Sequence, residues 1–171
     1  MGHRKRLNPS LHLSPPPSPQ PHPHPIPRSR GEGADIGVTV LTAASNKLVL
    51  WNQALINALA PRSFEDARAD AGWWGRLVEN AVGGHLLNHL PAPEWGVTYW
   101  RRGNAEVDFV VERGRAVWAL EVKSGRPRPA SGLSGFRSAY PKTHTLIIGS
   151  DGIPLEEFLG SDPRPLLEGA A

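Results

Sequence analysis

Two stretches of the chain place apolar residues at the spacing of an α-helix. The first begins after Asn52, which can cap a helix, and it ends at Pro61; its apolar residues are Leu55, Ile56 and Leu59. The second runs from about Trp73 to Leu90 and is ended by Pro91, with an apolar stripe formed by Val78, Ala81, Val82, Leu86 and Leu90. Gly83 and Gly84 interrupt this stripe, and they either weaken the helix or allow another element to pack close to it.

Apolar and alternating segments elsewhere predict five strands, at 47–51, 97–101, 105–112, 116–123 and 145–149. A short helix is expected at 133–139, and a further helix begins at Pro154. We therefore predict one α/β domain over residues 45–171.

Residues 1–44 have a different composition. Half of the 18 prolines lie within the first 30 residues, which also carry five basic residues and no acidic one, a net charge of +5. The remaining 14 basic and 16 acidic residues give residues 31–171 a net charge of −2. We predict a disordered, partly polyproline tail over 1–44. Its alternating His and Pro could bind a transition metal, but a low-complexity linker or a wrongly assigned start codon is the favoured interpretation.

The absence of cysteine excludes disulfides, thiolate metal sites and cysteine nucleophiles. The chain begins without the apolar segment of a signal peptide, and no apolar run approaches the ~20 residues of a membrane span. We expect a cytoplasmic protein that does not bind membranes.

The most informative segment is a predicted hairpin over 105–123. With a two-residue loop at Arg113 and Gly114, one face of the hairpin is continuously apolar, pairing Val107 with Leu120, Phe109 with Trp118 and Val111 with Ala116. The opposite face then carries Glu106, Asp108, Glu121 and Lys123.

This register places Glu106 directly across from Glu121, with Asp108 on the diagonal at roughly 7–8 Å. Like charges at such positions repel, and a divalent cation would convert the repulsion into binding, since Mg²⁺ takes one or two carboxylates with waters and phosphate oxygens. Lys123 adds a positive charge that could stabilise a phosphate. Carboxylates for a metal beside an ammonium for a phosphate indicate phosphodiester cleavage.

Glu79 is the fourth candidate. On the predicted long helix it shares a face with Val82 and Leu86, so its carboxylate points toward the core. Such a carboxylate is costly unless it is paired or bound to a metal.

The order Glu79, Asp108 and Glu121-Val122-Lys123 resembles the E…D…(D/E)xK pattern of the restriction-endonuclease-like, or PD-(D/E)xK, superfamily. Longer segments resemble the C-terminal domain of unknown function in AAA-type ATP-binding proteins of bacteria and archaea, over about residues 45–160. These segments are Lys47-Leu-Val-Leu-Trp-Asn-Gln-Ala-Leu-Ile-Asn-Ala-Leu, Gly75-Arg-Leu-Val-Glu-Asn, Tyr99-Trp-Arg, Glu106-Val-Asp-Phe-Val and Leu120-Glu-Val-Lys-Ser-Gly. The resemblance implies a central mixed sheet with a β-hairpin, flanked by helices.

The chain departs from that family in two ways. It has no G-x-x-x-x-G-K-[ST] motif, so it resembles a detached C-terminal domain, and no ATPase activity is expected from it. Val107 also stands where the superfamily's proline precedes the aspartate.

The resemblance implies a nuclease that uses Mg²⁺ or Mn²⁺. Asp108 and Glu121 would bind the metal, with the Val122 carbonyl as a further ligand. Glu79 would orient the attacking water, and Lys123 would stabilise the developing charge or help position the nucleophile. Four arginines could contact the nucleic-acid backbone or could simply confer solubility, namely Arg101, Arg102, Arg126 and Arg128.

Several residues have a structural alternative. Glu106 is expected to form an ion pair with Arg101 or Arg102, rather than to join the site. His85 and His89 lie one helical turn apart, but they lack the context of a metal site, so we favour a structural role.

Two other functions stay open. The first is a non-catalytic module that docks an ATPase domain or another partner, which Trp73 and Trp74 could face, while most of the tryptophans belong to the core. The second is a gene remnant without a function of its own, which reading the upstream DNA for a P-loop would test.

Overall fold

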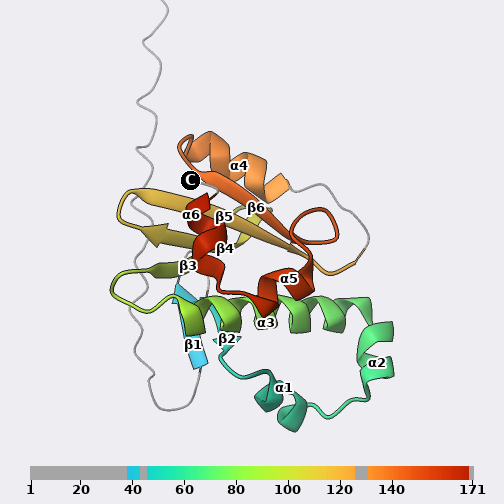
Figure 1. The fold of residues 1–171 in the computed structure, drawn as a ribbon. Helices are drawn as coiled ribbons and strands as arrows, with labels where there is room; N and C mark the ends of the chain where they lie inside the picture. The colour runs from blue at the N-terminus through green and yellow to red at the C-terminus, as the bar shows by residue number, and fades with distance from the viewer. Residues whose placement is uncertain (1–37, 43–45, 126–130, 170–171) are drawn as a thin grey trace, which may run out of the picture.

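The computed structural model describes residues 38–42, 46–125 and 131–169 (Figure 1). Its strands are β1 (Val38–Thr42), β2 (Asn46–Leu50), β3 (Gly96–Arg102), β4 (Ala105–Arg113), β5 (Ala116–Lys123) and β6 (His144–Gly149). Its helices are α1 (Gln53–Leu59), α2 (Phe64–Ala69), α3 (Ala71–His89), α4 (Ser131–Ala139), α5 (Leu155–Gly160) and α6 (Pro163–Gly169).

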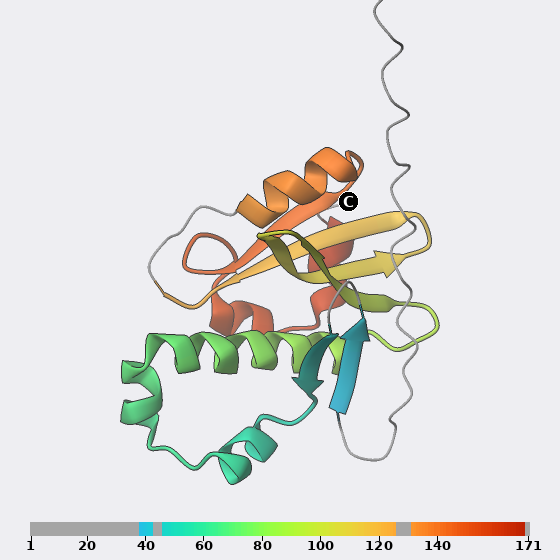
Figure 2. The ribbon, with the colours of Figure 1, turned by 180° about the vertical axis from the view of Figure 1, so that it is seen from behind.

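The centre of the fold is a mixed four-stranded sheet with the order β3-β4-β5-β6. Strands β3, β4 and β5 are antiparallel, and β6 runs parallel to β5 after the chain has crossed over through α4. Helix α4 covers one face of the sheet, and α3, α5 and α6 cover the other (Figures 1 and 2). The predicted α/β class, with a mixed sheet and a hairpin flanked by helices, is confirmed.

Each face of the sheet has its own apolar core. On the α3 side, buried residues of the sheet pack with residues of α3, α5 and α6, among them Val82, Leu86, Phe109, Phe158 and Leu167. On the α4 side, a smaller cluster contains Val107, Val110, Ala119, Leu133 and Phe136. The sheet is therefore buried on both faces, which fixes the direction of each side chain in β4 and β5.

Helix α3 begins where the Asp70 carboxylate accepts a hydrogen bond from the Trp73 amide at 3.0 Å. Its middle lies close to the sheet at Gly83, because a Cβ at that position would lie only 2.8 Å from Cζ of Phe109. Of the two explanations for the glycines in the apolar stripe, close packing is the one the structure supports.

The register of the hairpin differs from the prediction. The turn lies at Gly114 and Arg115, and Phe109 pairs with Leu120 and Val111 with Trp118. Gly114 has a φ of +60°, a conformation that glycine adopts at little cost, which places the turn one residue later than predicted. Glu106 is therefore not directly opposite Glu121.

Strand β4 also contains a bulge. Thr98 of β3 pairs with Val110, whereas Trp100 pairs with Val107, so the single residue Tyr99 faces two residues, Asp108 and Phe109. The bulge interrupts the alternation of sides, and the predicted continuous apolar face is wrong: Val107 packs on the α4 side, while Phe109 packs on the α3 side. Asp108 lies at this irregularity.

Strands β1 and β2 form a separate antiparallel hairpin beside α3 and β3 (Figure 2). Strand β1 lies inside the segment for which a disordered tail was predicted, and residues 1–37 and 43–45 lie outside the described residues. Helices α2 and α6 were not predicted. Helix α1 begins after Asn52 as predicted, but it buries no residue. None of the described helices has the length and apolar character needed to cross a membrane.

Candidate functional site

Lys47 of β2 forms ion pairs with three carboxylates from two other elements. Its Nζ contacts Glu79 of α3, lies 3.5 Å from Oδ1 of Asp108 and lies 3.7 Å from Oε1 of Glu106. It also donates a hydrogen bond to the main-chain oxygen of Asp108 at 3.1 Å. The side chain of Lys47 is only 16% exposed, so these charges meet in a partly buried place.

The alternation of side chains along β2 points Lys47 toward the interior of the protein. Val49, two residues later on the same side of the strand, is buried in the α3-side core, while Leu48 between them is 68% exposed. Lys47 was not among the predicted site residues. The segment Leu48-Val49-Leu50 is apolar at every position, so the sequence did not reveal which side of the strand is buried.

A second ion pair lies beside the first group. Nζ of Lys123 is 2.6 Å from Oε1 of Glu121, and each of these side chains is 13% exposed. Asp108 links the two groups, because its Oδ2 accepts a hydrogen bond from the Val122 amide at 2.8 Å while its Oδ1 faces Lys47. The structure thus brings together Glu79, Asp108, Glu121 and Lys123, the four residues predicted to be catalytic.

One oxygen of Glu121 has no hydrogen-bond partner among the described residues. Its Oε1 is bound by Lys123, whereas Oε2 is buried and unpaired. A buried acceptor without a partner is costly, unless a cation or a proton satisfies it. Burial raises the pKa of Glu121, and the negative charges of Asp108 and Glu106 add to the rise, against the opposing effect of Lys123.

The same electrostatics act on Glu79 and Lys47. Burial raises the pKa of Glu79, and the charges of Asp108 and Glu106 contribute, although Lys47 opposes them. For Lys47, burial alone would lower the pKa, but the three surrounding carboxylates outweigh burial and raise it. The ammonium is therefore held firmly in its charged form.

The whole cluster carries an excess of negative charge. With every group ionised, its four carboxylates (Glu79, Glu106, Asp108 and Glu121) and two ammonium groups (Lys47 and Lys123) give a formal charge of −2. Within the described residues, no group of three or more acidic or histidine side chains is arranged to hold a metal ion. Mg²⁺ can bind through only two carboxylates, however, and the pair Asp108 and Glu121, with its unpaired oxygen, fits such an ion in chemistry and charge.

A cleft of about 740 Å³ lies next to this cluster, between the beginning of α3 and the end of β5. Glu79 and Lys123 line it, together with Val122, Trp74 and the cationic side chains of Arg68 and Arg76. Arg68 and Arg76 were not predicted as site residues. They come from a helix that was missed and from the exposed side of α3, and only the tertiary structure places them beside Lys123.

The arginines that were predicted to bind nucleic acid do not line this cleft. Arg101 and Arg102 are exposed at the end of β3, where they pair with Glu106 and Ala105 in the strand register. Arg126 and Arg128 lie outside the described residues. The expected ion pair of Glu106 with Arg101 or Arg102 is not formed within the described part of the chain, where Glu106 instead faces Lys47.

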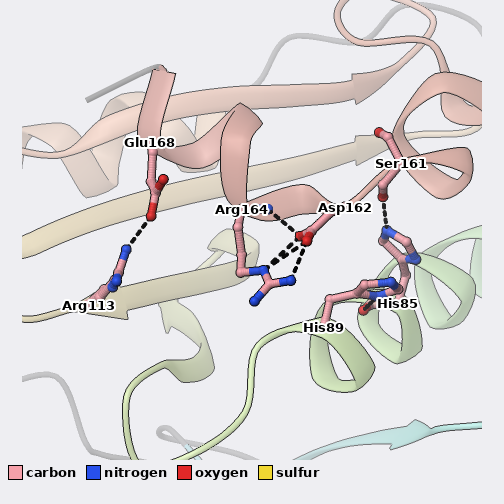
Figure 3. Close-up of polar contacts among 7 residues, drawn as sticks. All are labelled: His85, His89, Arg113, Ser161, Asp162, Arg164 and Glu168. Carbon is pink, nitrogen blue, oxygen red and sulfur yellow. Dashed lines mark hydrogen bonds and ion pairs between the residues drawn. The ribbon is translucent and has the colours of Figure 1, made fainter.

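The two histidines of α3 lie at its other end (Figure 3). His85 donates from Nε2 to the main-chain oxygen of Ser161 at 2.9 Å, and His89 donates from Nδ1 to the main-chain oxygen of His85 at 2.9 Å. The two rings lie 4.2 Å apart, and His85 also packs against Phe158. These contacts connect α3 to α5 and to the segment after it, in agreement with a structural role.

Trp73 and Trp74 are half-buried rather than open to solvent. The guanidinium groups of Arg62 and Arg68 each lie 4.8 Å from the ring centre of one of them, Arg62 over Trp73 and Arg68 over Trp74. Phe64 adds an edge contact to Trp74. The expectation that this pair faces a partner therefore gains no support from exposed ring surface.

Residues 74–156 match the family model described as Domain of unknown function (DUF4143). The matched segment begins within α3 and ends in α5, so it contains all four carboxylates and Lys123, whereas Lys47 precedes it. No curated protein and no solved structure matches the chain. The match supports the predicted domain of unknown function, and an activity has to be argued from the site itself.

Proposed function

We propose that this protein is a nuclease that hydrolyses nucleic-acid phosphodiesters with Mg²⁺ or Mn²⁺, and that its domain is related to the restriction-endonuclease-like superfamily. The observation that carries the proposal is the linked arrangement of Asp108, Glu121 and Lys123 at the edge of a cationic cleft. The excess charge of −2 in the cluster equals the charge that one divalent cation neutralises.

Asp108 and Glu121 would hold the metal, with the Val122 carbonyl as a further oxygen ligand. The bound cation would supply Lewis-acid stabilisation of the phosphate oxygens. Asp108 is already oriented for this role, because the Val122 amide fixes one of its oxygens. Glu121 contributes the buried oxygen that has no other partner among the described residues.

Lys123 would stabilise negative charge on the phosphate. Lys123 lines the cleft, and its ammonium is paired with Glu121, so the charge is positioned without a large loss of side-chain entropy on binding. Glu79 also lines the cleft, and burial raises its pKa. A carboxylate of raised pKa is a better proton acceptor, so Glu79 suits the task of orienting and deprotonating the attacking water.

Arg68, Arg76 and Lys123 give the cleft three cations. Phosphate contacts provide most of the affinity of proteins for nucleic acid without specifying sequence. We therefore place the backbone of the substrate in this cleft. Arg101, on the strand position opposite Glu106, would contact the substrate only beyond the cleft.

The test is cleavage of labelled single- and double-stranded DNA and RNA by the full chain, with Mg²⁺, Mn²⁺ or EDTA. We expect cutting that depends on the metal and that falls about 10²–10³-fold in Asp108→Asn, because an electrostatic group that acts on the transition state is worth this much. Asp162→Asn is the matched control, since Asp162 is a partly exposed aspartate that is paired with Arg164 and lies away from the cluster.

Cutting by the parent and by Asp162→Asn, but not by Asp108→Asn, would support the nuclease and identify its substrate. Equal cutting by all three proteins would contradict the proposal, because the activity would then not depend on Asp108. No cutting by a folded parent that also fails to bind Mn²⁺ would exclude the nuclease function.

A second function, docking to an ATPase domain or another partner, is favoured by one observation. Large apolar side chains are exposed along β2, α1 and the start of α2, namely Leu48, Trp51, Leu55, Leu59 and Phe64. If docking is the function, Leu59→Asp and Phe64→Asp would abolish co-sedimentation with a purified P-loop ATPase, and Leu59→Asp, whose parent side chain is the more exposed, would leave the thermal stability unchanged. Complexes that persist in both variants would exclude this surface.

A further inference from the structure

The ammonium of Lys47 lies in a place lined by oxygen atoms. Four oxygens surround it: one carboxylate oxygen each from Glu79, Glu106 and Asp108, and the main-chain oxygen of Asp108. These oxygens come from α3 and β4, while Lys47 reaches them from β2. Carboxylate and carbonyl oxygens are also the ligands that Mg²⁺ and Mn²⁺ prefer.

The surroundings strengthen these interactions. The Nζ atom lies 5.0 Å from the ring centre of Phe109 and 5.5 Å from that of Tyr99, so aromatic side chains exclude water on that side. In such a place, charges interact far more strongly than in water. Without Lys47, three carboxylates would face one another with no counter-charge of their own.

We propose that Lys47 is a resident cation of the site: it holds Glu79, Glu106 and Asp108 together when no metal is bound, and it competes with the divalent metal for Asp108. This inference rests on the proposed metal-dependent function. It concerns a residue that lies before the segment matched by the family model.

Asp108 is where the competition takes place. Its Oδ1 lies 3.5 Å from Lys47, and its Oδ2 is held by the Val122 amide, next to Glu121 in the chain. A metal bound by Asp108 and Glu121 therefore lies near the Lys47 ammonium and is repelled by it. The repulsion confines the metal to the Asp108 and Glu121 side of the cluster and keeps a second ion away from Glu79 and Glu106.

Removal of the lysine charge changes the cluster from −2 to −3. Two positive charges a few ångströms apart in a partly buried site interact by more than about 1.4 kcal/mol, which corresponds to a factor of ten in affinity. Lys47→Met keeps the length and the apolar stem of the side chain and removes the charge. We expect Lys47→Met to bind Mn²⁺ at least tenfold more tightly than the parent, or to bind an additional ion.

The experiment is calorimetric titration of the full chain with Mn²⁺, for the parent, Lys47→Met, Lys47→Arg and Lys142→Met. Lys47→Arg keeps the charge, so its affinity and stoichiometry should stay near those of the parent. Lys142→Met is the matched control, since Lys142 is exposed in the loop before β6 and lies outside the cluster. Thermal unfolding checks that each variant is folded.

Unchanged or weaker Mn²⁺ binding by a folded Lys47→Met would overturn the role of Lys47. If the parent itself binds no Mn²⁺, both this inference and the proposed function are wrong. If the parent binds the metal and cuts while Lys47→Met binds it no more tightly, only this inference fails.

A measurement on the parent keeps the proposal testable even if Lys47→Met does not fold. The NMR signal of the Lys47 ammonium group should shift as diamagnetic Mg²⁺ saturates the protein, because the metal draws Asp108 away from it. A signal that stays constant through saturation would contradict the competition.

Discussion

The two halves of helix α3 use charged residues in opposite ways. In the first half, Glu79 joins a partly buried cluster that has a formal charge of −2 and borders a cleft. In the second half, His85 and His89 bind main-chain oxygens, and the neighbouring Asp162 is paired with Arg164 (Figure 3). The first half retains an unbalanced charge beside a cleft, whereas the charges near the second half are paired locally.

This difference separates a candidate site from a structural contact more clearly than residue type does. Two histidines one turn apart could suggest a metal site, but one ring nitrogen of each is already bound to a main-chain oxygen of the fold. In the cluster around Glu79, by contrast, an oxygen of Glu121 has no hydrogen-bond partner within the described part of the chain, which is the kind of deficit that a ligand can satisfy. Four predictions test the contrast, from the largest expected effect to the smallest.

The largest effect is expected at Lys123. Lys123→Ala should lower the rate of metal-dependent cleavage about 10²–10³-fold, because it removes the charge that stabilises the phosphate in the transition state. Arg164→Ala removes a positive charge at the other end of α3 and should leave the rate unchanged. Single-turnover kinetics would measure both, and a Lys123→Ala protein that cuts at the parental rate would remove Lys123 from the mechanism.

The next effect concerns Gly83, where α3 packs closely against Phe109 of the sheet. Gly83→Ala should lower the free energy of unfolding by about 1–3 kcal/mol, because the new Cβ would lie 2.8 Å from the fully buried Phe109. In Gly72→Ala the new Cβ meets its nearest neighbour at an ordinary 3.5 Å. Urea denaturation should show a change of less than about 1 kcal/mol for Gly72→Ala. Equal stabilities of the two variants would contradict the close packing of α3 against the sheet.

The contributions of Glu79 and Asp162 to stability should also depend on pH with opposite signs. Burial raises the pKa of Glu79, so the folded state binds the proton more tightly, and the contribution of Glu79 to stability is lost as pH rises from its ordinary value of 4.5 through the raised value. Hydrogen bonds from Arg164 lower the pKa of Asp162 from 3.8 to about 2, so its contribution is present above 3.8 and is lost as pH falls toward 2.

The melting temperature of the parent relative to Glu79→Gln should therefore fall with rising pH above 4.5. Relative to Asp162→Asn, it should rise between pH 2 and 3.8. Thermal unfolding monitored by circular dichroism over this range would measure both differences. Parallel pH profiles for the two variants would contradict the proposed difference in environment.

The smallest effect is expected at Arg113, which connects β4 to the C-terminal helix. Its guanidinium is 2.5 Å from Glu94, pairs with Glu168 and lies 4.8 Å from the ring centre of Trp95. Because the two ion pairs are exposed, Arg113→Ala should cost only about 1 kcal/mol, and added salt should reduce the difference. A cost of several kcal/mol in chemical denaturation would mean that surface pairs contribute more here than we infer.

Local pattern was sufficient for most of the secondary structure. Helix α3 was found from its apolar stripe, the cap of α1 from Asn52, and strand β5 with the same bounds that the structure shows. The same pattern placed Glu79 on the inward side of α3 and indicated that Glu121 and Lys123 belong together. Periodicity and capping act over a few residues, so a single segment contains the information.

The tertiary structure decided the register of the hairpin and which charged side chains lie together. The sequence placed the turn one residue too early, because Arg113-Gly114 and Gly114-Arg115 are both plausible loops, and the bulge at Asp108 and Phe109 has no local pattern of its own. Lys47 joins the cluster because Val49 and not Leu48 is buried, and β2 could have presented either side until it packed on α3. Ion pairs between residues far apart in the chain depend on such packing, and the sequence alone therefore named the carboxylates but not the cation that holds them.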